Sequence, residues 1–206
     1  MTISARLESF LQQHQSRCVQ KLGRGFAAET YLLQDAKGKK SCLKIERDDS
    51  PRRDFTYKES EHLKAANAVR VGPKLLAADY ENRCIRMEYV DGTPFSKWVL
   101  DEKNPPSKAK LEKCVSGLLA QAKRLDAAGI DHGQLAGKGH NILVKKDGTP
   151  VIIDFEKSSM TRKPHNATQL ESFLFKNPHS ILTRTIHQKL GSDYNGISHQ
   201  DHVSHC

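Results

Sequence analysis

The amino-acid sequence predicts an α+β fold with two lobes, a small antiparallel sheet followed by a mainly helical part. Two observations predict the sheet: three strand-like apolar segments follow one another within the first 46 residues, and glycine-containing turns separate them. The helical part is predicted because apolar residues recur at helical spacing over 107–128. With 206 residues, the chain is long enough for one medium domain or two small lobes.

The first lobe is expected over residues 1–90. The spacing of Ile3, Leu7 and Phe10 predicts an amphipathic helix within the first dozen residues. Apolar runs bounded by turn residues predict the strands, and the fourfold spacing of Phe55, Glu59 and Leu63 predicts a second helix. The strands are expected at 18–22, 30–33, 41–46, 75–78 and 84–89, and the helix at 52–67.

The second lobe is expected over 91–190, because the turn-forming segment 91–94 interrupts the pattern of strands. A long helix is expected from Ser107, as its N-cap, to about Ala128. The remaining segments are a hairpin at 142–153, short helices at 166–176 and 178–190, and a polar, histidine-containing tail at 191–206 that is expected to be disordered.

The composition limits the class of protein. No run of 18 apolar residues is present, which predicts that the chain does not span a membrane, and the N-terminus lacks the apolar segment of a signal peptide. The five cysteines are scattered without a CxxC pair, which indicates a reducing, cytoplasmic environment.

The formal net charge of +9 is compatible with nucleic acid, an anionic membrane surface or a polyphosphate substrate as partner. The Lys and Arg residues are spread along the chain and no nucleic-acid motif accompanies them, so a solvated basic surface explains the charge equally well.

The most informative segment runs from residue 131 to residue 156. Two apolar runs flank Asp147-Gly148, a strong hairpin signal, and such a hairpin carries Asn141 and Asp154 to the same end. An amide oxygen beside a carboxylate suits a hard divalent ion such as Mg²⁺. The alternative is a surface hairpin with polar residues at its ends.

Four further features lie upstream of this hairpin. Gly23 and Gly25 are expected in a turn between two strands, where glycines let the backbone close over phosphate groups; a plain hairpin turn is the alternative. Lys44 interrupts an apolar strand and Glu59 on the next helix could pair with it; the alternative is a solvent-facing lysine. Finally, the strand end at 87–90 could offer backbone groups to a purine.

The order of these parts resembles the protein-kinase fold, and specifically its minimal branch of RIO-like and Bud32-like atypical kinases, over about residues 22–156. The resemblance implies ATP and Mg²⁺ (or Mn²⁺) as cofactors. It implies a glycine-rich loop at Gly23 and Gly25, a nucleotide-binding Lys44 oriented by Glu59, adenine contacts from the Glu88 C=O and the Val90 N–H, and metal ligands at Asn141 and Asp154.

The chain also departs from the kinase pattern. His132-Gly133-Gln134-Leu135 resembles the HGDL form of the catalytic loop, with Gln134 where the catalytic Asp is expected. The loop before Asn141 is two residues longer than usual, and Lys138 within it is a candidate charge stabiliser, or an ordinary solvated lysine. Gly133 replaces the Arg that would answer a phosphorylated activation loop, no APE-like segment follows, and only 50 residues follow Glu156.

The resemblance implies a phosphotransferase, a minimal Ser/Thr protein kinase that acts on a protein or on itself. Losing a general base costs about 10²–10⁴-fold, so Gln134 implies a slow enzyme. The alternatives are a nucleotide-binding pseudokinase that serves a protein partner, a small-molecule kinase, and a basic RNA-associated protein with a kinase-like fold.

Overall fold

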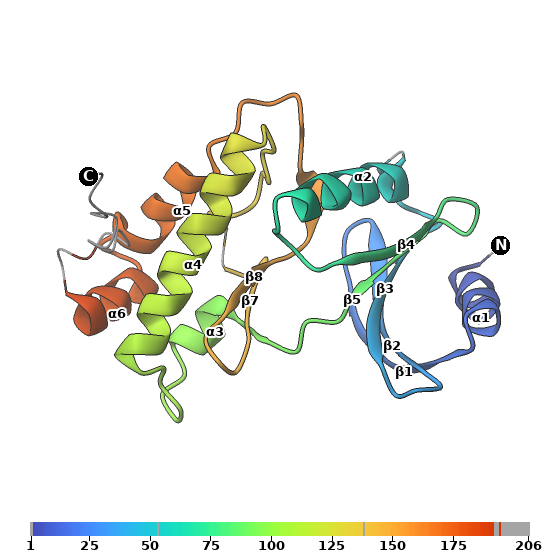
Figure 1. Cartoon of the computed structure of the whole chain (residues 1–206), viewed down its shortest axis with the longest axis horizontal. Coiled ribbons are helices and arrows are strands. Elements are labelled where there is room, and N and C mark those ends of the chain that lie inside the picture. The colour runs from blue at the N-terminus through green and yellow to red at the C-terminus, as the bar shows by residue number, and fades with distance from the viewer. Residues whose placement is uncertain (1, 53, 138, 192–193, 195–206) are drawn as a thin grey trace, which may run out of the picture. The chain divides into compact units, whose positions relative to one another are not determined.

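The computed structural model describes residues 2–52, 54–137, 139–191 and 194. The chain divides into two compact units, whose elements are labelled in Figure 1. Unit 1 comprises Met1–Ala68 and Gly72–Tyr89, and unit 2 comprises Val69–Val71 and Val90–Cys206.

Unit 1 is a five-stranded antiparallel sheet with two helices. The strand order is β1-β2-β3-β5-β4, so the strand that follows helix α2 forms one edge. The elements are α1 (Ile3–Gln13), β1 (Ser16–Arg24), β2 (Ala28–Asp35), β3 (Lys40–Glu46), α2 (Phe55–Ala68), β4 (Leu75–Asp79) and β5 (Cys84–Glu88).

The pleat of β3 sends alternate side chains to opposite faces of this sheet. Leu43 and Ile45 are fully buried and share a hydrophobic cluster with Phe10 of α1. Lys44, between them in sequence, points to the other face and reaches Glu59 of α2. The two helices therefore cover opposite faces, and the amphipathic pattern of α1 exists because one side of it covers the sheet.

Polar contacts fix the angle at which α1 lies on the sheet. The Arg6 side chain is only 3% exposed, and its Nη2 donates to the Glu46 backbone oxygen and to Asp48 Oδ1, both at 2.7 Å. The Glu46 carboxylate in turn accepts hydrogen bonds from Arg83 Nη2 at 2.6 Å and from the Thr56 hydroxyl at 3.0 Å. The Glu46 backbone oxygen and the Asp48 carboxylate thus compensate for part of the cost of burying this guanidinium, whereas its Nε is buried without a hydrogen-bond partner among the described residues.

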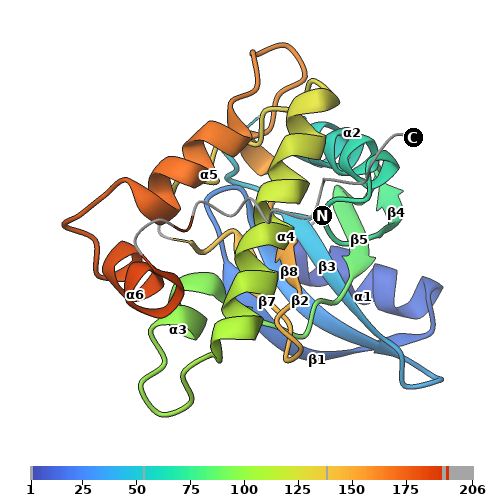
Figure 2. The ribbon, with the colours of Figure 1, turned by 60° about the vertical axis from the view of Figure 1, so that its left-hand side comes forward.

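Unit 2 combines a short three-stranded antiparallel sheet, in the order β6-β7-β8, with four helices and one 3₁₀ turn in its described residues. Helix α4 lies beside α5 and α6 (Figures 1 and 2). The elements are β6 (Thr93–Pro94), α3 (Phe95–Val99), α4 (Lys108–Ala127), β7 (Ile142–Val144), β8 (Pro150–Ile152), η1 (Phe155–Lys157), α5 (Asn166–Phe175) and α6 (Ile181–Leu190).

Helix α4 holds the β7–β8 hairpin in place. Ser107 caps the helix by accepting the Lys110 N–H at 3.4 Å. The buried Gln121 side chain then pairs with the hairpin backbone: its Nε2 donates to the Pro150 oxygen at 2.9 Å, and its Oε1 accepts the Ile152 N–H at 3.4 Å. The amide thus satisfies a strand that has no further sheet neighbour on that side.

The helices and strands expected from the sequence are present, with ends that shift by a few residues. Strand β6 and helix α3 were not predicted, because β6 is two residues long and owes its pairing to β7, about 50 residues later. The predicted disorder of the tail concerns residues that, apart from Gly191 and Tyr194, lie outside the described ranges. Among the helices of the described ranges, none is both long and apolar enough to cross a bilayer.

The packing of α1 predicts the effect of shortening its central aromatic side chain. Phe10→Ala should lower the free energy of unfolding by about 3–5 kcal/mol, because it leaves a cavity under α1. Urea denaturation followed by circular dichroism measures the change. Phe26→Ala is the matched control, because Phe26 is 63% exposed, and it should cost less than about 0.5 kcal/mol. Equal losses for both variants would contradict the packing.

Candidate functional site

In unit 1, Lys44 and Glu59 form the ion pair expected from the sequence. Lys44 Nζ lies 2.6 Å from Glu59 Oε1, and the two side chains are 14% and 2% exposed. The Phe55 ring, with its centroid 5.7 Å from the ammonium, covers one side of the pair. The free energy needed to desolvate two buried charges can exceed the free energy gained from their attraction. This pair therefore contributes little to the stability of the fold, and the surrounding structure holds it in place.

The other reactive side chain near Lys44 on β3 is the thiol of Cys42. Cys42 lies two residues before Lys44, on the same side of β3. Burial raises the pKa of the Cys42 thiol to about 11, with Lys44 opposing the shift. The thiol therefore stays protonated at neutral pH and is a poor nucleophile.

The glycine-rich segment differs from its expected place in the turn. Gly23 lies within β1, opposite Thr30, and the turn proper is closed by a hydrogen bond from the Gly25 N–H to the Ala28 oxygen at 2.8 Å. A Cβ atom on Gly23 would meet nothing within 4 Å, and one on Gly25 only an ordinary contact at 3.4 Å. Packing inside the chain thus gives no reason for glycine at either position.

Two residues expected to contact adenine lie where the units divide. Glu88 is the last residue of β5, and its N–H donates to the Lys74 oxygen at 2.8 Å. Val90 is buried and is the first residue of unit 2 after β5. The adenine contacts of both residues stay predictions.

In unit 2, the hairpin brings Asn141 and Asp154 to the same end. Ile142 pairs with Ile152, and the Ile153 N–H donates to the Asn141 oxygen at 2.9 Å, so Asn141 and Asp154 flank the last rung. Asp154 has left-handed backbone angles, φ 68° and ψ 75°, which cost a non-glycine residue about 1–3 kcal/mol and concentrate at functional sites.

His132 connects the catalytic loop to the segments around it. The sequence resemblance placed His132 in the catalytic loop, and its side chain is fully buried. The ring nitrogen Nε2 lies 3.0 Å from the Ile153 oxygen, and the ring packs edge-on against Phe155 at 4.9 Å between centroids. The His132 N–H donates to Asn166 Oδ1 at 2.9 Å. The loop is thereby joined to the segments on both sides of Asp154.

Gln134 follows at a partly exposed position, and its backbone oxygen accepts a hydrogen bond from Asn141 Nδ2 at 3.3 Å. The enlarged loop between these two residues contains Gly139, whose φ of +70° and 2.8 Å approach of a would-be Cβ to Ser96 Oγ require glycine. Lys138, the candidate charge stabiliser, lies outside the described residues.

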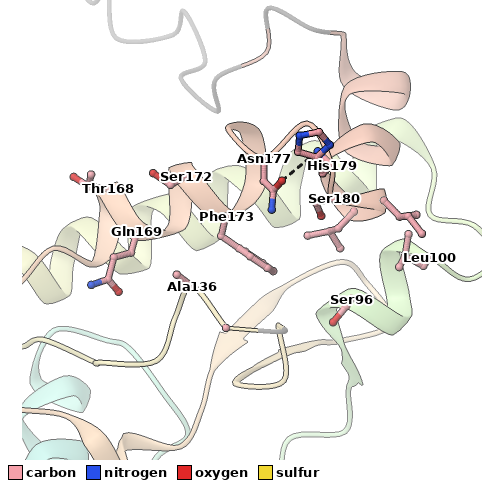
Figure 3. A pocket seen from close by; sticks show the side chains of 13 residues that line it. Ser96, Leu100, Ala136, Thr168, Gln169, Ser172, Phe173, Asn177, His179 and Ser180 are labelled. Carbon is pink, nitrogen blue, oxygen red and sulfur yellow. Dashed lines mark hydrogen bonds between the residues drawn. The ribbon is translucent and has the colours of Figure 1, made fainter.

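Two hollows adjoin this loop. The smaller has a volume of about 400 Å³ and is lined by Gln134, Asn141 and Lys157 among others. The larger, of about 930 Å³, lies between α3 and the α5–α6 region, and Figure 3 shows Phe173 pointing into it. Ala136 and Gly137 line both hollows, so the larger hollow extends from the loop along α5.

Sequence reasoning missed the polar network that supports the loop. Asn166 is fully buried; its Nδ2 donates to the Ile130 oxygen at 2.6 Å and to Asp126 Oδ1 at 2.8 Å. The Asp126 carboxylate also accepts the N–H groups of Asn166 and Ala167, at 2.8 and 2.9 Å, and so caps the N-terminus of α5. The sequence signal was only an Asn at a predicted helix start, which did not reveal its partners 36–40 residues earlier.

Comparison with known proteins agrees with this arrangement. A family model described as RIO domain matches residues 29–176, which is more than half of the chain. The chain belongs to the RIO domain family. The match includes Lys44, Glu59, Gln134, Asn141 and Asp154 and confirms the predicted kinase-like α+β fold, whereas helix α1 and the two glycines lie outside it.

A curated relative points in the same direction. The chain is 26% identical to the "Serine/threonine-protein kinase rio2" of Schizosaccharomyces pombe over an alignment of 166 residues, which covers 70% of this chain and 46% of the relative. The chain thus spans about half the length of that RIO protein. The match supports a kinase-like function in general terms.

The Asn166 network predicts a loss of stability on truncation. Asn166→Ala should lower the free energy of unfolding by about 2–4 kcal/mol, because it leaves the His132 N–H and the Ile130 oxygen buried without this partner. Urea denaturation measures the loss. Asn104→Ala, at an exposed position, is the control and should change stability by less than about 0.5 kcal/mol. A comparable loss in the control would refute the role of the network.

Proposed function

We propose that this RIO-family chain is an ATP- and Mg²⁺-dependent phosphotransferase that phosphorylates a Ser or Thr hydroxyl of a protein, including its own. In this reaction the bond from the γ-phosphorus to the bridging oxygen breaks, a bond to the hydroxyl oxygen forms, and ADP and a proton leave. The observation that carries the proposal is the desolvated Lys44–Glu59 pair, because its burial costs free energy that a nucleotide-binding role explains.

The roles in unit 1 follow from the chemistry of these groups. An ammonium can donate three hydrogen bonds, so the pair with Glu59 is compatible with contacts from Lys44 to phosphate oxygens. Glu59 restricts the position of that ammonium. A Cβ atom on Gly23 would meet nothing within 4 Å and one on Gly25 only an ordinary contact at 3.4 Å, so the β1–β2 backbone is open to approach by the phosphates.

The donor set of the hairpin fits a magnesium ion. Asn141 offers an amide oxygen and Asp154 a carboxylate, the hard oxygen ligands that Mg²⁺ and Mn²⁺ prefer. In the described part of the chain no cluster of three or more His, Cys, Asp or Glu side chains could hold a metal alone. This agrees with an ion that arrives with the nucleotide and takes its other ligands from phosphate and water. Bound there, the ion would neutralise charge on the phosphates.

Gln134 lies where the acceptor hydroxyl would be oriented. Its amide can hydrogen-bond a hydroxyl but cannot take its proton as a carboxylate does. Because phosphoryl transfer depends mainly on positioning and charge stabilisation, the expected enzyme is slow rather than inactive. The larger hollow beside α5 leaves room for more than a single hydroxyl-bearing group next to the loop.

The same Gln134 supports a second candidate, a pseudokinase that binds ATP and acts through a protein partner. In that case Lys44, Asn141 and Asp154 would retain the nucleotide while the acceptor side has lost its base.

Nucleotide binding is tested first by two substitutions. Lys44→Met should weaken ATP binding about 10–100-fold, the value of one or two charge-assisted hydrogen bonds. Asp154→Ala should remove the Mg²⁺ dependence of ATP affinity, measured by calorimetry with and without the ion. Lys39→Met, an exposed lysine near the start of β3, is the matched control and should bind like the wild type. Unchanged Mg²⁺-dependent affinity in Asp154→Ala would sink the site assignment.

Restoring the carboxylate separates the two candidates. If the chain is a slow kinase limited by its missing base, Gln134→Asp should raise γ-phosphate transfer from labelled ATP by up to about 10²-fold. The readout is label on protein or as free phosphate over time, in wild type, Gln134→Asp and Lys44→Met. Transfer by the wild type that is lost in Lys44→Met establishes a kinase. ATP binding by the wild type, with no transfer by the wild type or by Gln134→Asp, establishes a pseudokinase.

A further inference from the structure

Among the residues that the structure describes, one lysine, Lys157, lines the small hollow beside the catalytic loop. The hollow has a volume of about 400 Å³, and Gln134 and Asn141 line it with neutral amides. Lys157 lines the same hollow, and its exposed side chain can bring an ammonium group to these amides. The sequence did not point to Lys157, because it follows the hairpin as one of many solvated lysines of a basic chain.

The backbone of Lys157 is held in place although its side chain is exposed. It ends the 3₁₀ turn η1, three residues after Asp154 and two after the buried Phe155. Its carbonyl oxygen accepts a hydrogen bond from Arg162 Nη2 at 2.6 Å. Only the flexible part of the lysine side chain is therefore left to move.

Arg162 connects this carbonyl to the start of the catalytic loop. Its Nε donates to Asp131 Oδ2 at 2.6 Å, and the other oxygen of the Asp131 carboxylate accepts the Gly133 N–H at 3.2 Å. The Asp131 backbone also exchanges two hydrogen bonds with Ser159, at 2.9 and 2.8 Å. The segment after η1 is thus fastened to residues 131–133 by both side chains and backbone.

This arrangement explains the glycine that precedes Gln134. Gly133 has a φ of +76°, and a Cβ atom there would lie 2.7 Å from Arg162 Nη2 and 2.7 Å from the Lys157 oxygen. In the kinase pattern this position holds an Arg that answers a phosphorylated loop. Here the guanidinium comes from Arg162 instead and pairs with Asp131, so the segment is ordered without a phosphate group.

We propose that Lys157 is a catalytic residue whose ammonium contacts the phosphoryl group during transfer, and that Arg162 is a positioning residue that acts through the Lys157 backbone. The proposal rests on the phosphotransferase function proposed above. Negative charge spreads over the three equatorial oxygens of the transferring group, and an ammonium that reaches the hollow beside Gln134 and Asn141 stabilises it. The hydroxyl proton leaves to solvent, since neither amide accepts it.

Three lysine variants test the catalytic part. Lys157→Met should lower kcat for γ-phosphate transfer about 10–100-fold, less than a buried donor would, because water screens an exposed lysine. The Kd of MgATP should change by less than about twofold, and Lys157→Arg should keep most of the activity because it keeps the charge. Lys163→Met is the matched control: an exposed lysine on the same segment that should transfer phosphate like the wild type.

A double-mutant cycle tests the positioning part. Arg162→Met should lower kcat in the wild-type background but have little further effect in Lys157→Met, because Arg162 acts through Lys157. A merely structural Arg162 would lower the thermal midpoint and activity equally in both backgrounds, which would overturn this part.

Other outcomes separate this proposal from the proposed function. Wild-type kcat in Lys157→Met, or a loss of kcat matched by weaker MgATP binding, would overturn the catalytic role of Lys157 alone. MgATP binding without transfer by the wild type would also overturn it, while leaving the nucleotide site intact. Neither binding nor transfer by the wild type would refute the phosphotransferase itself.

Discussion

The buried side chain of Asn166 holds together the part of unit 2 on which the candidate site depends. Its amide oxygen accepts the His132 N–H, and its amide nitrogen donates to Ile130 and to Asp126 at the end of α4. Helix α5, the end of α4 and the catalytic loop therefore meet at one fully buried amide. Because an unsatisfied group there would cost about 1–3 kcal/mol, the loop has little freedom to move away.

Further hydrogen bonds connect this loop to the β7–β8 hairpin. His132 bonds the Ile153 backbone, and Gln121 of α4 bonds the backbone of β8, which leads into Ile153. The Asn141 backbone oxygen accepts the Ile153 N–H across the last rung. The positive φ of Asp154 is sustained because residues on both sides of it are fixed in this way. Rigid support of a strained acidic residue is what a metal-holding group requires, since its ligand atoms must keep their positions.

Unit 1 holds the Lys44 side chain largely out of water next to a carboxylate. Glu59 on α2 provides the counter-charge at 2.6 Å, and the apolar face of α1 covers the opposite side of the sheet. The buried ion pair adds little stability by itself, so the hydrophobic cluster around Phe10 has to compensate. The family match begins at residue 29, so α1 lies outside the matched region.

The sequence alone determined the α+β class, the order of most elements, the hairpin and the Lys44–Glu59 pair. These features depend on the period of apolar residues, on turn residues and on short spacings, which are local patterns in the sequence. Only the tertiary structure decided that His132 is buried, that Gly23 lies in a strand, and that Arg162 reaches Asp131 from 31 residues away. It also paired β6 with β7. These features depend on contacts between distant segments, which no local pattern encodes, because a polar residue reads the same in sequence whether its partner is water or a buried amide.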